Sequence, residues 1–496
     1  MRTKINYKAI MNNKPIPSPL LSLVPILVLV SMLAVTIHIF GSDALAGGSQ
    51  VCLLTATAFC VLIGMAGFKR SWKDYEKCII ENIGGIGTAL IILLLIGALS
   101  GAWMICGVVP TLIYYGIQII DPNFFLVSTC LICAIVSVMT GSSWTTIATI
   151  GIALLGIGKA QGFEEGWIAG AIVSGAYFGD KVSPLSDTTV LAASTTGTPL
   201  FTHIKYLMLT TIPSMVIALI IFTIAGLSHD SASTLHIAEF TQALGDKFNI
   251  SIWLMIVPVI TAILIAKRVP SIITLFLSTA LAIIMATIFQ PDLLREIAGE
   301  GEGSLQLVKG AMTTLFGSTS LDAGNPEINE LIGTRGMSGM MDTIWLIICA
   351  MCFGGAMTAT GMIQSITSVF MKFTKRCVSL VSSTVASGLF MNLTTADQYI
   401  SIILTGNMFK DIYKKCGYES RLLGRTVEDA VTVTSPLIPW NSCGMTQSTV
   451  LGVSTFTYLP YCFFNYISPL MSIFMAAIGY KIVKASRTGS DKKASV

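Results

Sequence analysis

The sequence predicts an all-α polytopic membrane protein, and composition and length are the observations that predict it. Of the 496 residues, 53% are apolar and only 11% are charged, whereas a soluble domain carries roughly 25% charged residues. The mean hydropathy is +0.77. So few charges cannot cover a water-facing surface, which excludes a soluble enzyme, a nucleic-acid-binding protein and a disordered scaffold. The length accommodates on the order of ten membrane-spanning helices of roughly 20 residues each.

The N-terminus is predicted to be a cytoplasmic tail, 1–18, followed by a retained first helix. The tail is basic, and the apolar run 19–40 is long enough to span a bilayer and longer than the apolar region of a signal peptide. Further apolar segments lie at 47–68, 83–118, 124–158, 166–200, 203–226, 250–266, 270–289, 305–318, 342–370, 378–409, 426–453 and 457–480.

Basic residues between the apolar segments predict which side each connection lies on, because cytoplasmic loops are enriched in Lys and Arg. The basic connections, which we place in the cytoplasm, are 69–77, 267–268, 372–376 and 410–425, together with the C-terminal tail 485–496. The connections poor in basic residues, which we place outside, are 41–48, the one at Asp121, 159–165, 227–249 and 291–303. Both termini are then cytoplasmic, and the second half of the chain has the opposite orientation to the first.

Four short matches at an offset of 252 to 254 residues predict that the two halves are repeats. The matches pair Gly101-Ala102 and Gly107 with Gly355-Ala356 and Gly361, Met139 and Ser142-Ser143 with Met391 and Thr394-Thr395, 183–185 with 435–437, and 206–207 with 458–459. Inverted repeats are a signature of secondary transporters. We therefore divide the chain into a first repeat, 19–226, an extracytoplasmic linker, 227–249, and an inverted second repeat, 250–484, with five crossings and one re-entrant hairpin in each.

The segments 124–158 and 378–409 are the predicted re-entrant hairpins, because each begins and ends on one side and is interrupted by small polar residues. Non-helical backbone at membrane depth persists only where protein or a watery cavity satisfies its polar groups. We expect the two tips to form part of a midplane site, although a single hydroxyl often only bonds back to its own helix. The tip residues are Thr140, Ser142 and Ser143 in one hairpin and Asn392, Thr394, Thr395 and Asp397 in the other.

The strongest local signal is the polar stretch 175–189, which lies between two apolar segments. A charge at the bilayer centre costs about 3 kcal/mol or more, so its presence indicates a function. Pro184 breaks the helix and frees backbone carbonyls, which together with hydroxyls and a carboxylate are ligands for a dehydrated sodium ion. The alternative is a solvent-exposed loop with Asp180 and Lys181 in water. The candidate ion or substrate ligands are Asp180, Ser183, Pro184, Ser186, Asp187 and Thr188.

A second polar stretch, 425–442, supplies the candidates Asp429, Thr432, Ser435 and Asn441. Arg425 and Asp429 are four residues apart and can pair on one helix face, with Glu428 as a possible third member of a structural ion pair. The alternative is a helix that starts at the cytoplasmic surface with these three charges at the interface. Asp180, Asp187 and Asp429 are the candidates for binding Na⁺.

At these residues the sequence resembles the NhaC family of sodium/proton antiporters. The matching stretches are 175–194, 425–444 and 458–470. The resemblance implies an ion-transporter fold of inverted repeats with re-entrant hairpins, an elevator motion, and, since elevator transporters are often dimers, a homodimer in the lipid bilayer. The family also includes malate/lactate antiporters coupled to Na⁺ and H⁺. The second hairpin departs from the small-residue tip of related sequences, because Asp397 adds a carboxylate there.

The function predicted from the sequence is exchange of Na⁺ for H⁺ across the cytoplasmic membrane by alternating access, because one desolvated carboxylate can hold either ion but not both. The alternative is an antiporter of the same fold for an organic acid, with Asn441, Ser183 and the hairpin tips holding the acid's carboxylate. A channel has less support. We expect no enzyme activity and no resident cofactor, because no His lies in a polar cluster and the four histidines have no ligand spacing. Two cysteine pairs, Cys130/Cys133 and Cys349/Cys352, have the CxxC spacing of a redox or metal site, but no strand pattern or histidine accompanies either pair, so we expect them to pack as apolar residues.

Overall fold

The computed structural model describes residues 15–40, 47–228, 234–267, 269–300, 303–371 and 376–484. In this part of the chain the regular structure is helical, apart from two isolated β-bridges, Thr319–Thr334 and Tyr418–Lys484. By length and composition, nine of the described helices can cross a membrane, or up to eleven if each of two bent pairs counts as one span. The prediction of an all-α polytopic membrane protein is therefore confirmed. The basic residues of the N-terminal tail and the whole C-terminal tail, 485–496, lie outside the described residues.

The first half of the chain contains α2 (Pro19–Phe40), α3 (Gly48–Gly67), α4 (Trp72–Gly85), α5 (Gly87–Ile105), α6 (Val108–Ile119), α7 (Phe125–Thr140), α8 (Ser143–Thr146), α9 (Ile152–Ala160), α10 (Glu165–Val182), α11 (Asp187–Thr196) and α12 (Leu200–Leu227). The connection that the sequence analysis treated as a linker contains a helix, α13 (Thr234–Lys247).

The second half contains α14 (Ile256–Ala266), α15 (Ser271–Phe289), α16 (Pro291–Ala298), α17 (Gly303–Phe316), α18 (Pro326–Ile332), α19 (Met341–Thr360), α20 (Met362–Met371), α21 (Cys377–Thr395), α22 (Gln398–Lys415), α23 (Ser420–Val427), α24 (Ser442–Leu451), α25 (Thr455–Tyr458) and α26 (Phe463–Ala477). Two π-helical turns, η3 (Ile147–Gly151) and η6 (Glu428–Thr432), continue α8 and α23.

Two helical hairpins lie in the segments 124–158 and 378–409, where the sequence analysis expected hairpins. That they are re-entrant stays a prediction, because three of their arms are long enough to cross a membrane. Hairpin 1 runs from α7 to α9 and turns at Gly141, whose φ of 67° is left-handed; the rings of Phe125 and Phe163, at its open end, are 5.2 Å apart. Hairpin 2 consists of α21 and α22 and turns at Ala396, with φ 55°. There the hydroxyls of Thr384 and Tyr413 are 3.0 Å apart, so its two helices are also antiparallel.

The tip of hairpin 1 is held by one threonine. The amide of Ser142 donates to Thr140 Oγ1 (3.2 Å), and the hydroxyls of Thr140 and Thr146 are 3.2 Å apart. Ser142 also caps the next helix, because its Oγ accepts from the amide of Thr145 at 3.2 Å. These bonds replace the backbone hydrogen bonds that the turn interrupts.

The tip of hairpin 2 repeats this pattern 255 residues later. The amide of Asp397 donates to Thr395 Oγ1 (3.4 Å), the hydroxyls of Thr395 and Ser401 are 2.8 Å apart, and Asp397 Oδ1 accepts from the amide of Ile400 at 2.9 Å. The sequence comparison had instead matched Ser142-Ser143 with Thr394-Thr395. The structure aligns the tips three residues later, because Ala396 takes the left-handed conformation that ends α21.

A broken helix follows each hairpin. The second arms of the two hairpins, and the helices that follow the two breaks, are also 255 residues apart in sequence. The segments Ser143–Ala160 and Gln398–Lys415 differ by 255 at both their first and last residues, and so do α11 and α24. Both α11 and α24 end at a left-handed glycine, Gly197 (φ 78°) and Gly452 (φ 69°). The breaks lie at 183–186 and 433–441, and both contain a Ser-Pro-Leu sequence in which Pro lacks the amide needed to continue a helix.

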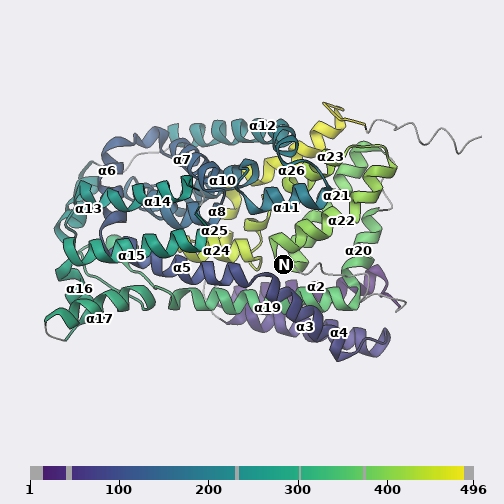
Figure 1. Cartoon of the computed structure of the whole chain (residues 1–496), viewed down its shortest axis with the longest axis horizontal. Coiled ribbons are helices and arrows are strands. Elements are labelled where there is room, and N and C mark those ends of the chain that lie inside the picture. Colours follow the sequence, from purple (N-terminus) through teal and green to yellow (C-terminus); the bar gives the residue numbers. More distant parts are fainter. Residues whose placement is uncertain are drawn as a thin grey trace, which may run out of the picture.

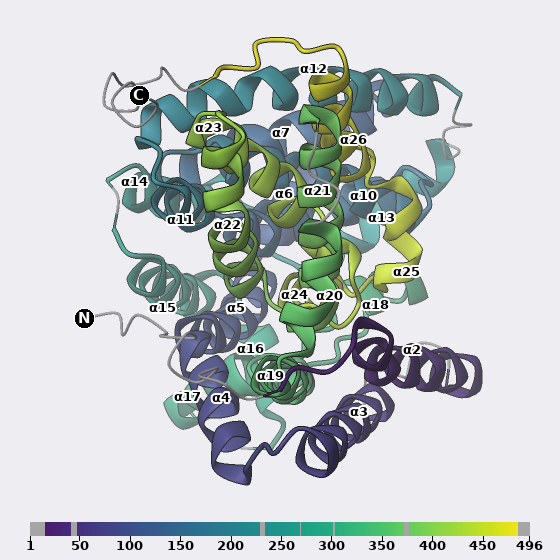
Figure 2. The ribbon, with the colours of Figure 1, turned by 90° about the vertical axis from the view of Figure 1, so that its right-hand side faces the viewer.

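The two hairpins open toward opposite ends of α12, which at 28 residues is about 42 Å long. Near its start, Tyr206 donates to the carbonyl of Lys481 (2.9 Å) and lies beside Arg421, at the open end of hairpin 2. Near its end, Gly226 packs against the backbone of Asn123, at the open end of hairpin 1. Figure 1 shows this arrangement, with α7 and α13 toward the left and α21, α22 and α23 toward the right. Figure 2, turned by 90° from Figure 1, shows α12 above α7, α21 and α22.

The connections that the sequence analysis placed on one side also lie together. Lys247 Nζ is 2.8 Å from Glu296, and Gln161 donates to the carbonyl of Ile120 (2.9 Å), while α13 packs against α6 and α9. These contacts join the four described connections that are poor in basic residues. At the other end of the molecule, Lys410 donates to the carbonyl of Thr195 at 2.9 Å.

Candidate functional site

Asp180, in the last turn of α10, lies at the centre of a ring of hydroxyl groups. Its Oδ2 accepts from Ser143 Oγ (2.7 Å), and its Oδ1 accepts from Ser186 Oγ (2.6 Å) and Thr188 Oγ1 (3.5 Å). The side chain is 6% exposed. We call Asp180, Ser143, Ser186 and Thr188 the Asp180 cluster; it joins the tip of hairpin 1 to both sides of the first helix break.

The break itself places these groups. Pro184 has no amide to donate to the carbonyl of Asp180, four residues earlier, and the hydroxyl of Thr189 donates to that carbonyl instead, at 3.0 Å. Ser183 Oγ donates to the carbonyl of Val138 (2.8 Å), which fastens the break to hairpin 1. Ser186 then begins α11 as its N-cap while its hydroxyl donates to Asp180.

Glycines allow hairpin 1 to approach α10 closely enough for Ser143 to reach Asp180. A Cβ atom at Gly175 would overlap the carbonyl of Cys130, and one at Gly179 would overlap the backbone of Val138. The short distance between α7 and α10 therefore depends on residues that lack a side chain.

The Asp180 cluster provides the ligands that a small hard cation prefers. It combines a carboxylate with three hydroxyls in a buried setting, and such oxygen ligands suit hard cations. Among the described residues, no Lys, Arg or His nitrogen lies within 4.0 Å of the Asp180 carboxylate. Its charge can thus be balanced by a bound cation or by a proton.

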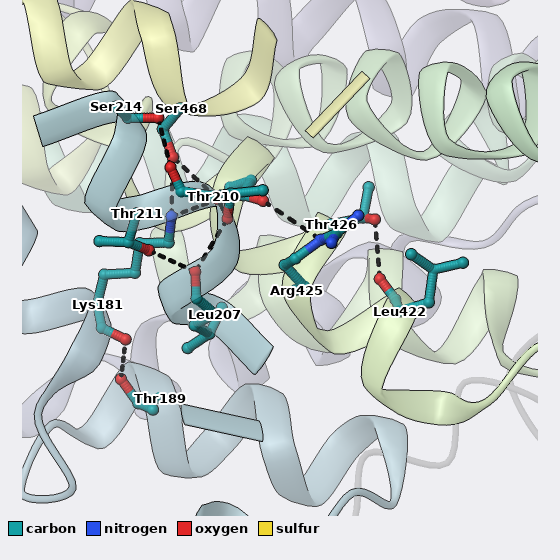
Figure 3. Close-up of polar contacts among 11 residues, drawn as sticks. Lys181, Thr189, Leu207, Thr210, Thr211, Ser214, Leu422, Arg425, Thr426 and Ser468 are labelled. Atoms are coloured by element: carbon teal, nitrogen blue, oxygen red, sulfur yellow. Dashed lines mark hydrogen bonds and ion pairs between the residues drawn. The ribbon is translucent and has the colours of Figure 1, made fainter. Parts of the chain in front are cut away.

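A second buried cluster surrounds Asp429, and Figure 3 labels three of its members, Lys181, Thr210 and Ser468. Lys181 forms an ion pair with Asp429 Oδ1, which also accepts from Thr210 Oγ1 (3.0 Å) and Ser468 Oγ (2.9 Å). Lys181 Nζ additionally donates to Ser468 Oγ at 2.8 Å. We call these four residues, which are fully buried and come from α10, η6, α12 and α26, the Lys181 cluster. The sequence analysis assigned Lys181 no role; the signal was a lysine within an apolar region, which needs a carboxylate partner.

The predicted grouping of Arg425, Glu428 and Asp429 is present only in part. Arg425 Nε lies 4.0 Å from Asp429 Oδ2, and its guanidinium lies 4.8 Å from the centre of the Tyr206 ring. Glu428 is fully buried, and its oxygens accept no hydrogen bond from the described residues. Glu428 therefore stands apart from the pair.

The predicted residues of hairpin 2 join its tip to the second helix break. Asn392 Nδ2 donates to the carbonyl of Val431 (2.8 Å), Asn441 Nδ2 donates to the carbonyl of Asn392 (3.1 Å), and Ser442 Oγ donates to Asp397 Oδ2 (3.2 Å). Asp397 is thus, like Asp180, a buried carboxylate that accepts hydrogen bonds, but the donors recorded for it are one hydroxyl and a backbone amide instead of three hydroxyls.

Most of the remaining candidates bond locally or face outward, whereas Thr432 is fully buried and its hydroxyl has no hydrogen-bond partner among the described residues. Thr394 and Thr395 donate to carbonyls of their own helix, Phe390 O and Met391 O, and Ser435 Oγ donates to the carbonyl of Thr432 at 2.8 Å. Pro184 and Asp187 are exposed. Asp187 occupies the first turn of α11, where a carboxylate is favoured by the helix N-terminus. Its side chain is not one of the groups that surround the Asp180 carboxylate.

Comparisons with known proteins bear on this arrangement. Residues 175–480 match the sequence model of a family described as the Na⁺/H⁺ antiporter family. The chain is 37% identical over 434 residues to the Na⁺/H⁺ antiporter NhaC of Alkalihalophilus pseudofirmus, covering 88% of this chain and 90% of that protein. It is 37% identical over 413 residues to the NhaC of Bacillus subtilis (83% and 88% covered). It is 35% identical over 449 residues to the malate-2H⁺/Na⁺-lactate antiporter of Bacillus subtilis (89% and 93% covered).

Proposed function

The chain belongs to the Na⁺/H⁺ antiporter family, and we propose that it is a secondary active transporter that exchanges Na⁺ for H⁺ across the cytoplasmic membrane by alternating access. The observation that carries this proposal is the buried Asp180 carboxylate, ringed by the hydroxyls of Ser143, Ser186 and Thr188 at 2.6 to 3.5 Å. Sodium would take its ligands from these oxygens, whose hydroxyl hydrogens rotate away from the ion. A proton would instead bind directly to the carboxylate.

Competition between the two ions at one carboxylate accounts for exchange. A bare carboxylate away from water is strongly disfavoured, so the site crosses the membrane only with a cation or a proton on it. Each ion must leave before the other binds, and this couples their fluxes in opposite directions. Ser143 belongs to hairpin 1 while Ser186 and Thr188 belong to α11, so a shift of the hairpin tip would change the ligand set.

We further propose that the chain consists of two inverted repeats that provide alternating access by an elevator motion, with both termini in the cytoplasm. Two observations support the repeats: the 255-residue spacing of the hairpins and broken helices, and the opposite directions in which the hairpins open along α12. Inverted repeats with a binding site between discontinuous helices are the usual architecture of such transporters.

The direct test is proton flux driven by a sodium gradient in proteoliposomes. Asp180→Asn removes the charge but keeps the shape, and loss of a charged ligand worth about 3 kcal/mol corresponds to a loss of roughly 100-fold in exchange rate at limiting sodium. The matched control is Asp292→Asn, since the Asp292 side chain is 91% exposed and, among the described residues, pairs with Arg295 three residues later. Full sodium-driven proton flux in Asp180→Asn would contradict the assignment.

The second candidate function is exchange of an organic acid with Na⁺ and H⁺ as coupling ions. It is favoured by the 35% identity to a malate/lactate antiporter, which is close to the identity with the sodium/proton antiporters. Uptake of labelled malate or lactate against an imposed sodium gradient separates the two. Sodium-dependent uptake of either acid would establish the second function, whereas proton flux that needs no organic acid supports the first.

A further inference from the structure

The buried carboxylates of Asp180, in α10, and Asp429, in η6, have similar surroundings but differ in one respect. Asp180 Oδ1 accepts two hydroxyl groups, and Asp429 Oδ1 likewise accepts the hydroxyls of Thr210 and Ser468, at 3.0 and 2.9 Å. The ring around Asp429 also contains an ammonium group, Lys181 Nζ, whereas the ring around Asp180 contains no cationic group. Both rings have the oxygen chemistry of a site for a monovalent cation.

The ammonium group of Lys181 has three neighbours in its ring. An ammonium group has three N–H donors: two of the polar contacts of Nζ are Asp429 Oδ1 and Ser468 Oγ, and its third neighbour is the ring of Phe464, whose centre is 5.7 Å away, within cation–π range. The side chain is 0% exposed. Figure 3 shows Lys181 reaching from α10 to Thr210 and Ser468 on two other helices.

Chain geometry connects the two rings. Asp180 and Lys181 are consecutive, and successive side chains on a helix point about 100° apart, so α10 presents a carboxylate to one ring and an ammonium to the other. The other carboxylate oxygen, Asp429 Oδ2, has no hydrogen-bond partner among the described residues, and the nearest charge recorded for it is Arg425 Nε at 4.0 Å. Asp429 therefore depends on Lys181 for the cation in direct contact with it.

We infer that the ring of Asp429, Thr210 and Ser468 is a second monovalent-cation site, which Lys181 occupies permanently with its own ammonium group. Lys181 is a tethered cation, and removing it would open the ring to Na⁺ or a small alkylammonium ion. One consequence rests on the proposed function: with this ring filled, the transporter loads a single sodium ion, at Asp180, in each cycle. The occupancy of the ring by Lys181 does not depend on what the protein transports.

The test uses Lys181→Met, which keeps an unbranched apolar stem and removes the ammonium. In purified protein, we expect the melting temperature to fall below that of the wild type and to recover on addition of methylammonium chloride or sodium chloride. Choline chloride at the same ionic strength should have no effect, because its cation is too bulky for the ring. In the wild type, methylammonium and sodium can act only at the open ring of Asp180, so they should raise the melting temperature by less than in Lys181→Met.

Two variants make the result specific. Lys181→Met with Asp429→Asn removes both charges, so methylammonium should raise its melting temperature no more than it raises that of the wild type. Lys159→Met is the matched control, because Lys159 is partly exposed and pairs at 2.6 Å with Glu165; it should behave as the wild type does. A Lys181→Met protein that can be isolated only with methylammonium or sodium present supports the inference. A Lys181→Met protein whose stability is indifferent to these cations overturns it, as does one that cannot be isolated with either cation while the double variant can.

Transport gives a second readout. Sodium activation of exchange should be hyperbolic in the wild type and sigmoid in Lys181→Met, with a Hill coefficient that rises from about 1 toward about 2, the number of sites then available. If the wild type shows no sodium/proton exchange, the proposed function fails, and the melting experiment still decides whether Lys181 fills a cation site.

Discussion

Each hairpin turns on a single left-handed residue, and the two residues differ. Gly141 has φ 67° and Ala396 has φ 55°. A left-handed conformation costs a non-glycine residue about 1–2 kcal/mol, so hairpin 2 tolerates a strain that hairpin 1 avoids. The surroundings explain why: a Cβ atom at Gly141 would lie 2.6 Å from the carbonyl carbon of Leu185, in the break beside Asp180.

We therefore predict that two substitutions, Gly141→Ala and Ala396→Gly, differ in their effect on the stability of the protein. Gly141→Ala adds both the strain and the contact with Leu185, so it should destabilise the protein by more than about 2 kcal/mol and raise the sodium concentration for half-maximal flux. Ala396→Gly relieves the backbone strain, but glycine loses more conformational entropy on folding, which costs about 0.5–1 kcal/mol. The stability of this variant should therefore stay within about 1 kcal/mol of the wild type. Thermal unfolding of the purified variants measures both. Equal stability of Gly141→Ala and the wild type would show that the tip does not pack on the break.

Residue patterns predicted part of the site. A buried carboxylate beside a proline and several hydroxyls indicated the Asp180 cluster, because all of its members except Ser143 lie within nine residues of chain. The partner of Lys181 was not predictable in this way, since Asp429 is 248 residues away and four helices meet at the pair. Asp187 and Asp180 look alike in sequence, and only the start of α11 at Ser186 turns Asp187 outward.

At the scale of elements, the packing of hairpin 1 on α10 positions the site. The substitution Gly179→Ala tests this packing by adding a single methyl group, whose carbon would overlap the backbone of Val138. Overpacking of this kind costs about 1–3 kcal/mol, and it would push α7 away from α10, so that Ser143 withdraws from Asp180. We expect weaker sodium dependence of flux and a lower melting temperature.

The control for this prediction is Gly84→Ala in α4, where no atom lies within 4 Å of the added Cβ. That substitution should be neutral or slightly stabilising, because alanine favours a helix over glycine. If both variants show the same sodium affinity as the wild type, the close approach of α7 and α10 does not hold the ligands in place.

Elements with a strong apolar signal were predictable, and those that depend on local turns were not. The broken helix at Pro184 follows from the missing proline amide. The apolar run 83–118 gave no sign that it divides at Cys106 and Gly107, where Gly107 takes a left-handed φ of 89°. The amphipathic helix α13 lies in a stretch too polar to register as a span, and its stability comes from packing on α6 and α9 rather than from hydropathy.

At the scale of the whole molecule, charge and topology agree. Connections poor in basic residues meet at the end of the molecule where hairpin 1 opens, and the basic Lys410, Lys414 and Lys415 lie at the end where hairpin 2 opens. The two hairpins were predictable as segments, but which residues of their tips correspond was not. The hydroxyl residues of the two tips can be matched in two ways that differ by about one helical turn. The opposite directions of the hairpins are the feature of this architecture that an experiment on intact membranes can address.

We predict that the open ends of the two hairpins are reached by an impermeant maleimide from opposite sides of the membrane. Cys416, which follows α22, is exposed, as is Glu164, which precedes α10. In inverted vesicles the wild-type protein should be labelled at Cys416, and Cys416→Ser should lose that labelling. In intact cells, Glu164→Cys in the Cys416→Ser background should be labelled, since the positive residues near Cys416 predict that the Cys416 end lies in the cytoplasm and the Glu164 end outside. Labelling of both positions from one side would refute the opposite orientation of the hairpins, whereas labelling from reversed sides would refute only the assignment of the cytoplasmic end.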